Sequence, residues 1–260
     1  MRRKVLLGAI AISAVLSSPA LSADMQRPAL KAPPAAAPFY NWTGCYIKGG
    51  GGYGMWNQDT TVFDGSVQFG SEIRTGGRGW FGTVGAGCDY QIGERWVIGV
   101  FGDYDFASIK GDFAASFDGT VIGGREKLKS AWAVGGRIGY LITPAVLTYI
   151  SGGFTEARFS GVELATFEIP PDTVGARIDQ HTYSGWFLGS GFEYNLGWMP
   201  GLFWRTEYRF ASYDNENLLV VRSPSGAPTG FSVDTEKFVQ TIRSELVWRF
   251  NWGGSVRGAY

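Results

Sequence analysis

Acidic and basic side chains recur at every second position in several segments of the sequence, a spacing that places them in one shared environment. In the segment LFWRTEYRF, which begins at Leu202, Arg205, Glu207 and Arg209 share one parity and Trp204 lies on the other. Strict alternation is typical of a β-strand with two unlike faces. Charges gathered on one face either guide charged solutes along a channel or pair with one another in a closed interior.

The charged residues on one parity of their segments form a candidate interior set. Acids and bases are nearly balanced in it, so a paired network is as consistent with the pattern as a solute path. The set comprises Lys48, Asp89, Asp103, Arg137, Glu193, Arg205, Glu207, Arg209, Arg243 and Glu245, and Asp105 and Lys129 share its parity.

His181 is the single histidine of the chain, and Tyr183 follows two residues later. Imidazole and phenolate both ligate haem iron, so this pair is a weak candidate for haem binding. Ser184 and Glu156 could complete a hydrolase set with His181, but no nucleophile motif surrounds the serine. We favour a solvated histidine at a loop edge, and we expect no catalytic residue, no metal site, no cofactor and no enzymatic activity.

Eight segments with period-two alternation must position these residues. Seven of them keep the charges of their central stretch on one parity, and the fifth is ambiguous. In that segment only Glu156 and Arg158 indicate a face, with Leu147 and Tyr149 on the uncharged side. The segments are Thr43–Trp56, Gly79–Ile92, Trp96–Ser108, Leu128–Leu141, Ala145–Phe159, Thr182–Leu196, Leu202–Phe210 and Lys237–Phe250.

The connections between these segments alternate in length. Three are short, at Gly93–Arg95, Ile142–Pro144 and Gly197–Gly201, and the other four contain about twenty residues each. Tight turns at one rim and long loops at the other are typical of outer-membrane barrels. The sequence therefore predicts an all-β fold, an eight-stranded antiparallel up-and-down transmembrane β-barrel with short periplasmic turns and long extracellular loops.

In a membrane barrel, the cost of placing charge in lipid determines which face of each strand lies inside. A Lys or Arg facing lipid near the bilayer midplane costs about 2–4 kcal/mol, so the charged parity must face the interior and the aromatic parity the lipid. Aromatic residues near strand ends would form the two interfacial girdles. Because eight strands leave an interior that side chains just fill, we favour a paired network over a conducting lumen.

The composition is unusual for a soluble enzyme: charged residues make up 18% of the chain, aromatic residues 15%, and 39 residues are glycine. No internal stretch approaches the roughly 20 apolar residues of a spanning helix. The net charge of zero argues against nucleic acid as a partner.

The N-terminus has the features of an export signal. MRRK provides a basic region, Val5–Leu16 is apolar but too short to span a bilayer, and small residues follow up to Ser22. We expect a signal peptide over 1–22, a Pro/Ala-rich periplasmic linker over 23–41, the barrel over 42–250 and a periplasmic tail over 251–260. The sequence does not define the oligomeric state.

Cys45 and Cys88 share the outward parity of the first two segments. A hairpin register that pairs residues near Trp56 and Gly79 brings the two cysteines within about one residue pair of each other. The cell envelope is oxidising, so a disulfide is compatible with this geometry, and two free thiols are the alternative.

Two motifs resemble one family: NWTGCYIKGGGGYG (Asn41–Gly54), preceded by the exported Pro/Ala-rich leader, and the closing strand LVWRF. The chain resembles alphaproteobacterial outer-membrane surface antigens, a small OmpA-type, porin-like barrel class whose relatives include haemin-binding antigens. The resemblance implies insertion by the outer-membrane assembly machinery, which reads a last strand ending in an aromatic residue. Here the chain departs from the pattern, because ten residues follow Phe250 and position 45 is cysteine.

The sequence thus predicts an integral protein of the bacterial outer membrane in contact with lipid and lipopolysaccharide. We expect a structural and surface role with a charged network filling the lumen. A small passive porin-like channel and a haem or ligand receptor are the alternatives. The run LLVV (Leu218–Val221) in the last long connection is either an exposed apolar patch or, as we favour, a strand continuing above the membrane.

Overall fold

The computed structural model describes residues 41–117, 119–166 and 173–250. The expected signal peptide, residues 23–40 of the linker and the C-terminal tail lie outside the described residues. Within the described part, no helix is long and apolar enough to cross a membrane. The all-β, antiparallel prediction is confirmed, because every strand pairing there is antiparallel.

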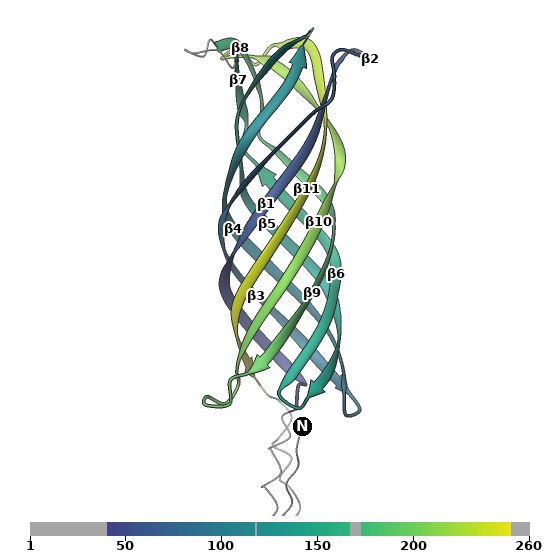
Figure 1. The fold of residues 1–260 in the computed structure, drawn as a ribbon, viewed down its shortest axis with the longest axis vertical. Helices are drawn as coiled ribbons and strands as arrows, with labels where there is room; N and C mark the ends of the chain where they lie inside the picture. The colour runs from purple at the N-terminus through teal and green to yellow at the C-terminus, as the bar shows by residue number, and fades with distance from the viewer. Residues whose placement is uncertain (1–40, 118, 167–172, 251–260) are drawn as a thin grey trace, which may run out of the picture. The chain divides into compact units, whose positions relative to one another are not determined.

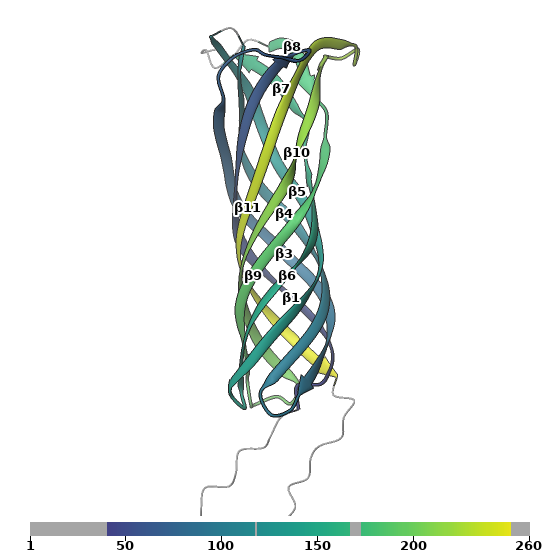
Figure 2. The ribbon, with the colours of Figure 1, turned by 90° about the vertical axis from the view of Figure 1, so that its right-hand side faces the viewer.

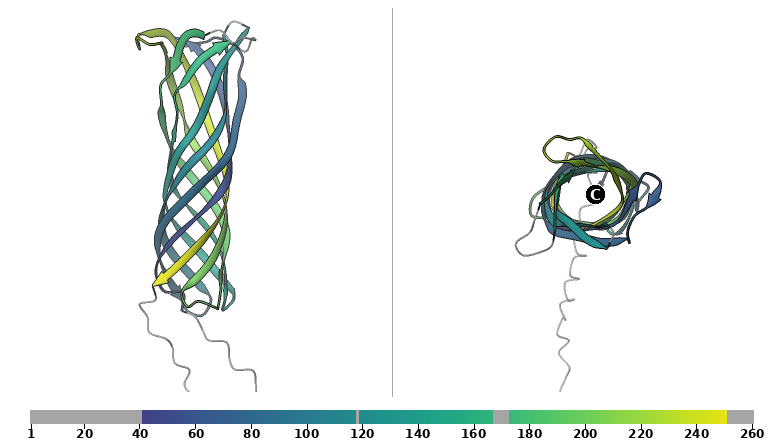
Figure 3. Two further views of the ribbon diagram at one scale, coloured as in Figure 1. Left: turned by 90° about the vertical axis from the view of Figure 1, so that its left-hand side faces the viewer. Right: turned by 90° about the horizontal axis from the view of Figure 1, so that it is seen from above.

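Eight long strands form a closed ring in the order β1-β3-β4-β5-β6-β9-β10-β11, and β11 pairs back onto β1 (Figures 1 and 3). Each matches one of the eight alternating segments, to within one residue where the segment extends past the strand, and three short strands accompany the ring within the described residues. The strands are β1 Gly44–Asp64, β2 Val67–Gln68, β3 Ile73–Ile92, β4 Trp96–Phe117, β5 Thr120–Thr143, β6 Val146–Phe159, β7 Val162–Thr166, β8 Thr173–Ile178, β9 His181–Asn195, β10 Leu202–Arg222 and β11 Pro228–Phe250.

The two ends of the ring differ. The end that carries the connections β3–β4, β5–β6 and β9–β10 also holds the start of β1 and the end of β11, and we call it the turn rim (Figure 2). Gly93 has a φ of 62° in the first of these turns, a left-handed conformation that glycine adopts without a steric penalty. The opposite end, with β2, β7 and β8, is the loop rim.

Three of the four long connections are shorter than the sequence predicted, because the strands continue through them. The β4–β5 ladder extends to Phe117↔Thr120, and only residues 223–227 separate β10 from β11. Apolar side chains fill the interior of this extension, including Phe113, Val220 and Val233, so the segments are held by a core of their own. The LLVV run lies within β10, as we favoured from the sequence.

The two faces of the ring have opposite character. Outward-facing side chains such as Trp80, which is 72% exposed, and Ile150, which is 62% exposed, form a broad apolar belt around the ring. Inward-facing charged residues such as Arg205 and Glu193 are at most 1% exposed. A soluble protein would bury the first group and expose the second, so this surface suits a lipid environment.

Lys129 was predicted to face inward, and the structure corrects this. The register shifts between Leu128 and Ser130 on one side of β5 and between Phe106 and Ile109 on β4, which is the signature of a β-bulge. The extra residue reverses the parity, so Leu128 is buried and Lys129 is exposed.

The parity of β6 is also the opposite of what its two charges indicated. Leu147 and Tyr149 face the interior and are buried, whereas Ile150 and Arg158 face outward. Arg158 lies near the loop rim end of β6, four residues beyond the outward ring of Phe154, where a charge no longer has to avoid lipid.

Cys45 and Cys88 lie directly opposite each other in the β1–β3 ladder, with their Cα atoms 3.9 Å apart, and form a disulfide. The sequence predicted an offset of about one residue pair between the two cysteines, and the observed register has no offset. Protein extracted without reductant is expected to show no thiol labelling after denaturation, and reduction should expose both thiols. Labelling of two thiols before reduction would contradict the disulfide.

Candidate functional site

Three arginines surround one carboxylate in the half of the interior nearer the turn rim. Glu193 on β9 accepts hydrogen bonds from Arg205 Nε (2.9 Å) and Nη2 (2.6 Å) on the neighbouring strand, where the register pairs the two residues directly. Arg249 on β11 reaches it at 2.7 Å, and Arg137 on β5 at 3.1 Å. The alternation of each strand delivers these side chains to the same point in the ring.

Asp89 and two tyrosine rings complete this group. The Asp89 carboxylate binds both Arg137, whose Nε donates at 2.9 Å, and Arg249, whose Nη1 lies 2.7 Å away. The Tyr46 ring lies 4.7 to 5.0 Å from the guanidinium carbons of all three arginines, and Tyr149 lies 5.0 Å from that of Arg137. These cation–π contacts stabilise positive charge where the acids alone are outnumbered.

A second group lies on the side of the loop rim and is centred on Asp103. Arg209 donates two hydrogen bonds of 2.9 Å to its carboxylate in a bidentate pair, and Lys48 Nζ lies 3.0 Å from it. Lys48 also contacts Glu245 at 3.1 Å, and Arg209 contacts Glu207 at 2.8 Å.

Two further contacts extend and connect the groups. Arg243 Nη2 lies 3.1 Å from Asp105, and its Nη1 lies 3.6 Å from Asp103. The Tyr149 hydroxyl donates to Glu207 at 2.8 Å and so links the group around Asp103 to the group around Glu193.

All ten residues of the candidate interior set lie in these two groups. Together with Asp105 and Arg249, they give six basic and six acidic side chains, so the formal charges cancel. We call these twelve residues the ion network; its bases are Lys48, Arg137, Arg205, Arg209, Arg243 and Arg249, and its acids are Asp89, Asp103, Asp105, Glu193, Glu207 and Glu245. Of the three charged residues that share one parity in LFWRTEYRF, Arg205 pairs with Glu193, and Glu207 pairs with Arg209.

A separate buried ion pair lies closer to the loop rim. Lys237 Nζ is 2.9 Å from Glu126, contacts the Gln58 side-chain oxygen, and lies 4.4 Å from the centre of the Phe159 ring. The sequence reasoning missed this pair because Glu126 was assigned to a loop. The continuation of alternation beyond Leu128 was the signal that could have revealed it.

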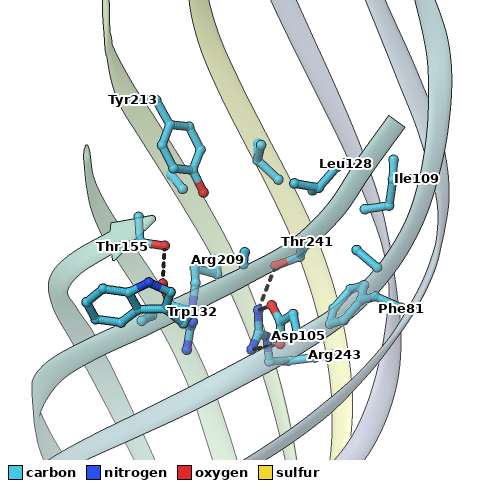
Figure 4. A pocket seen from close by; sticks show the side chains of 15 residues that line it. Phe81, Asp105, Ile109, Leu128, Trp132, Thr155, Arg209, Tyr213, Thr241 and Arg243 are labelled. Atoms are coloured by element: carbon cyan, nitrogen blue, oxygen red, sulfur yellow. Dashed lines mark hydrogen bonds and ion pairs between the residues drawn. The ribbon is translucent and has the colours of Figure 1, made fainter. Parts of the chain in front are cut away.

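An apolar layer separates the Lys237 pair from the ion network. Phe81, Ile109, Leu128 and Val239 are buried in it and belong to the main apolar core. Figure 4 shows a cavity among them, next to Arg209 and Arg243 and lined by Tyr213. Its volume of about 30 Å³ has room for only one or two water molecules.

Trp42 covers the interior at the turn rim. Its side chain is fully buried, its ring centre lies 4.9 Å from that of Phe203, and Arg249 stacks against it at 5.0 Å. The indole Nε1 donates to the carbonyl oxygen of Pro144 at 3.2 Å, which ties the ring to the β5–β6 turn. Sequence reasoning used Trp42 only as part of the opening motif.

The structure brings the rings of His181 and Tyr183 together, with centres 5.0 Å apart in an edge-to-face arrangement. The phenol of Tyr183 is buried and hydrogen-bonded to Thr235 at 2.9 Å. His181 Nε2 lies 3.7 Å from Glu216, and Ser184 Oγ contacts Glu156 at 3.5 Å. Among the described contacts, Ser184 therefore pairs with Glu156, whereas His181 lies next to a different acid, Glu216. These contacts do not join the three residues into one hydrolase set.

Two curated relatives are similar to the chain over most of its length. The 31 kDa outer-membrane immunogenic proteins of Brucella melitensis and Brucella suis are each 28% identical to it over 229 residues, covering 84% of this chain and 90% of the relative. No family model matches the chain.

Solved structures of other small outer-membrane proteins also resemble it. The outer membrane protein OprG from Pseudomonas aeruginosa is 11% identical, with 82% of this chain and 100% of that chain covered and a TM-score of 0.49. The outer membrane protease OmpT from Escherichia coli is 12% identical, with 80% and 97% covered and a TM-score of 0.42. At these TM-scores, no site is transferred from either structure.

The similarity to the Brucella proteins agrees with the resemblance carried by the Asn41–Gly54 motif and the closing strand. The apolar outer belt and the charged interior are the arrangement that a membrane barrel requires. The chain is an integral protein of the bacterial outer membrane, similar to alphaproteobacterial surface antigens.

Proposed function

We propose that this protein is a structural and surface barrel of the outer membrane whose lumen is closed to solutes. In this proposal the ring of eight strands spans the membrane, the turn rim faces the periplasm and the loop rim faces the environment, where it contributes to surface interaction. The protein supports envelope integrity as a rigid element and has no enzymatic activity and no cofactor. The assembly machinery would recognise β11, which ends at Phe250.

The ion network is the observation that carries the proposal. Its acids and bases are buried and paired with one another, so a passing ion would have to replace these contacts. A conducting filter instead binds each ion weakly enough for the ion to leave its site and move on. Trp42 at the turn rim and the apolar layer near Leu128 add two further obstacles on either side of the network.

Single-channel recording tests the closed lumen. The refolded chain, inserted into planar bilayers, is expected to give no conductance steps under conditions in which a large general porin does. Parallel unboiled and boiled gel samples should show that the inserted protein is folded. Regular steps from folded protein would reject the closed lumen and favour the small passive channel.

The contact between His181 and Tyr183 keeps a receptor for haem as the second candidate. His181 is partly exposed near the loop rim and so accessible to a ligand, while the buried hydrogen bond of Tyr183 to Thr235 leaves the phenol engaged. Titration of the folded chain with haem, followed by the Soret band, decides between the two. A shift that His181→Ala abolishes would support the receptor, and no saturable shift is expected for a purely structural barrel.

A further inference from the structure

Basic side chains gather on the outer surface of one side of the ring, near the loop rim. We call Arg78 on β3, Lys110 on β4, Lys127 and Lys129 on β5, and Arg158 on β6 the basic band. The register places Arg78 opposite Lys110, and Lys110 opposite Lys127, so three like charges follow one another across adjacent strands.

This arrangement is unfavourable for the protein alone. Like charges directly opposite each other on neighbouring strands destabilise a sheet. Within the described residues, none of the five has an ion pair, and Lys129 instead donates a hydrogen bond of 2.8 Å to Gln180. Two acidic side chains share this face: the Glu156 carboxylate accepts a hydrogen bond of 2.9 Å from Trp132 Nε1, and Asp112, two residues beyond Lys110 on β4, lies opposite Arg125 on β5. A bound anion would remove the repulsion.

The opposite side of the ring has the opposite charge at a similar height. Asp214 on β10 and Glu236 on β11 are exposed there, and Glu236 lies across from Asp59 on β1. Arg74 on β3 lies opposite Asp59 and is already paired with it at 2.6 Å. The basic band is therefore a one-sided feature and not a general property of the rim.

Exposed aromatic rings lie just below the basic band, towards the middle of the belt. Each of the four strands provides one: Trp80 on β3, Phe106 on β4, Trp132 on β5 and Phe154 on β6, with exposures of 72%, 61%, 38% and 42%. The Trp132 and Phe154 rings are in contact, with centres 5.5 Å apart. The basic groups could bind the anionic head of a lipid, and the four aromatic rings below them could contact its acyl chains.

We propose that the basic band binds the phosphate groups of lipopolysaccharide, with the acyl chains of its lipid A resting on the four aromatic rings. Arg and Lys are the side chains that bind phosphate, and basic residues at the membrane surface attract anionic headgroups. This assignment uses the proposed orientation, in which the loop rim faces the outer leaflet. It goes beyond the closed lumen, because the site lies on the outside of the ring.

The test measures binding of purified lipid A to the full chain folded in dodecyl maltoside micelles. The probes are bis-phosphorylated lipid A and the same lipid with both phosphates removed, and thermophoresis gives the apparent Kd. The unaltered chain should bind the phosphorylated form at least tenfold more tightly. Equal affinity for the two forms would overturn the proposal without the need for any variant.

A charge-matched pair of variants locates the site. The triple change Arg78→Gln, Lys110→Gln and Lys127→Gln should raise the Kd for phosphorylated lipid A more than about tenfold, since each basic group near a membrane surface contributes several-fold. The control removes three basic groups elsewhere, with Arg95→Gln, Arg177→Gln and Arg222→Gln, and should leave the Kd within about twofold.

An equal loss in the control would overturn the proposal, because it would show attraction to overall charge and not to the band. Gel mobility before and after boiling verifies folding. If the triple variant does not fold, Lys110→Gln, at the centre of the row, replaces it, and an unchanged Kd there would count against the site. The assay is performed in detergent, so its outcome is independent of whether the lumen conducts.

Discussion

Glu193→Gln is expected to lower the free energy of unfolding by about 3–5 kcal/mol, the usual cost of removing one partner from a buried ion pair. The change keeps the shape of the side chain but leaves Arg205 and Arg249 without their shared carboxylate and leaves Asp89 to balance three guanidinium groups. Urea unfolding of the barrel in micelles, followed by tryptophan fluorescence and by gel mobility, gives the measurement.

Asp59→Asn is the matched control, because it also turns a carboxylate bound to an arginine into an amide. The Asp59–Arg74 pair has contacts of 2.6 and 2.8 Å, but Arg74 is 73% exposed, so water replaces the lost contact and the loss of stability should be far smaller than at Glu193. Combining Glu193→Gln with Arg205→Gln should cost less than the sum of the single changes. Small, additive effects at both positions would mean that water fills the lumen and would favour the channel.

Ile150→Arg is expected to cost about 2–4 kcal/mol of barrel stability, since its guanidinium group would face lipid near the bilayer midplane. Ile150 lies midway along the membrane belt of β6, between Val146 at the turn rim and the outward ring of Phe154, and it is 62% exposed. The folded fraction after refolding into lipid vesicles, read from the gel shift and from urea titration, provides the measure.

Leu219→Arg supplies a control with the same exposed fraction, 62%, on the part of β10 that continues beyond the belt. It should change stability by less than about 1 kcal/mol, because charged residues near or beyond the interface are tolerated. Equal losses at the two positions would indicate that the belt does not contact lipid. Equal tolerance would contradict contact between the Ile150 side chain and lipid near the bilayer midplane.

Alternation along the chain was sufficient to place the eight ring strands and to select the charged residues of the ion network other than Arg249, which the sequence analysis did not name. It works because a strand has only two faces and the membrane penalises a charge on one of them. Arg205 and Glu193 needed only parity and a short turn to be placed close together, and the register pairs them directly.

Prediction failed where a local feature broke the period or where the membrane no longer imposed it. The bulge at Lys129 reversed the parity in β5, and the charges of β6 lie near its loop rim end, where either face is tolerated. The Lys237–Glu126 pair lies in strand extensions that resembled loops by length alone. The basic band required the register between β3, β4 and β5, which no single segment contains.

The pairing of β1 with β11 runs from Cys45↔Phe250 to Asp64↔Phe231, so the first ring strand depends on the last one along its whole length. The ion network depends on β11 in the same way. Lys48 pairs with Glu245, which lies 197 residues later in the sequence, and Arg249 pairs with both Glu193 and Asp89. A chain that ends before β11 loses Arg243, Glu245 and Arg249 together and leaves their partners as uncompensated charges. The charges of the network are therefore balanced only in a molecule that contains β11 and has closed the ring.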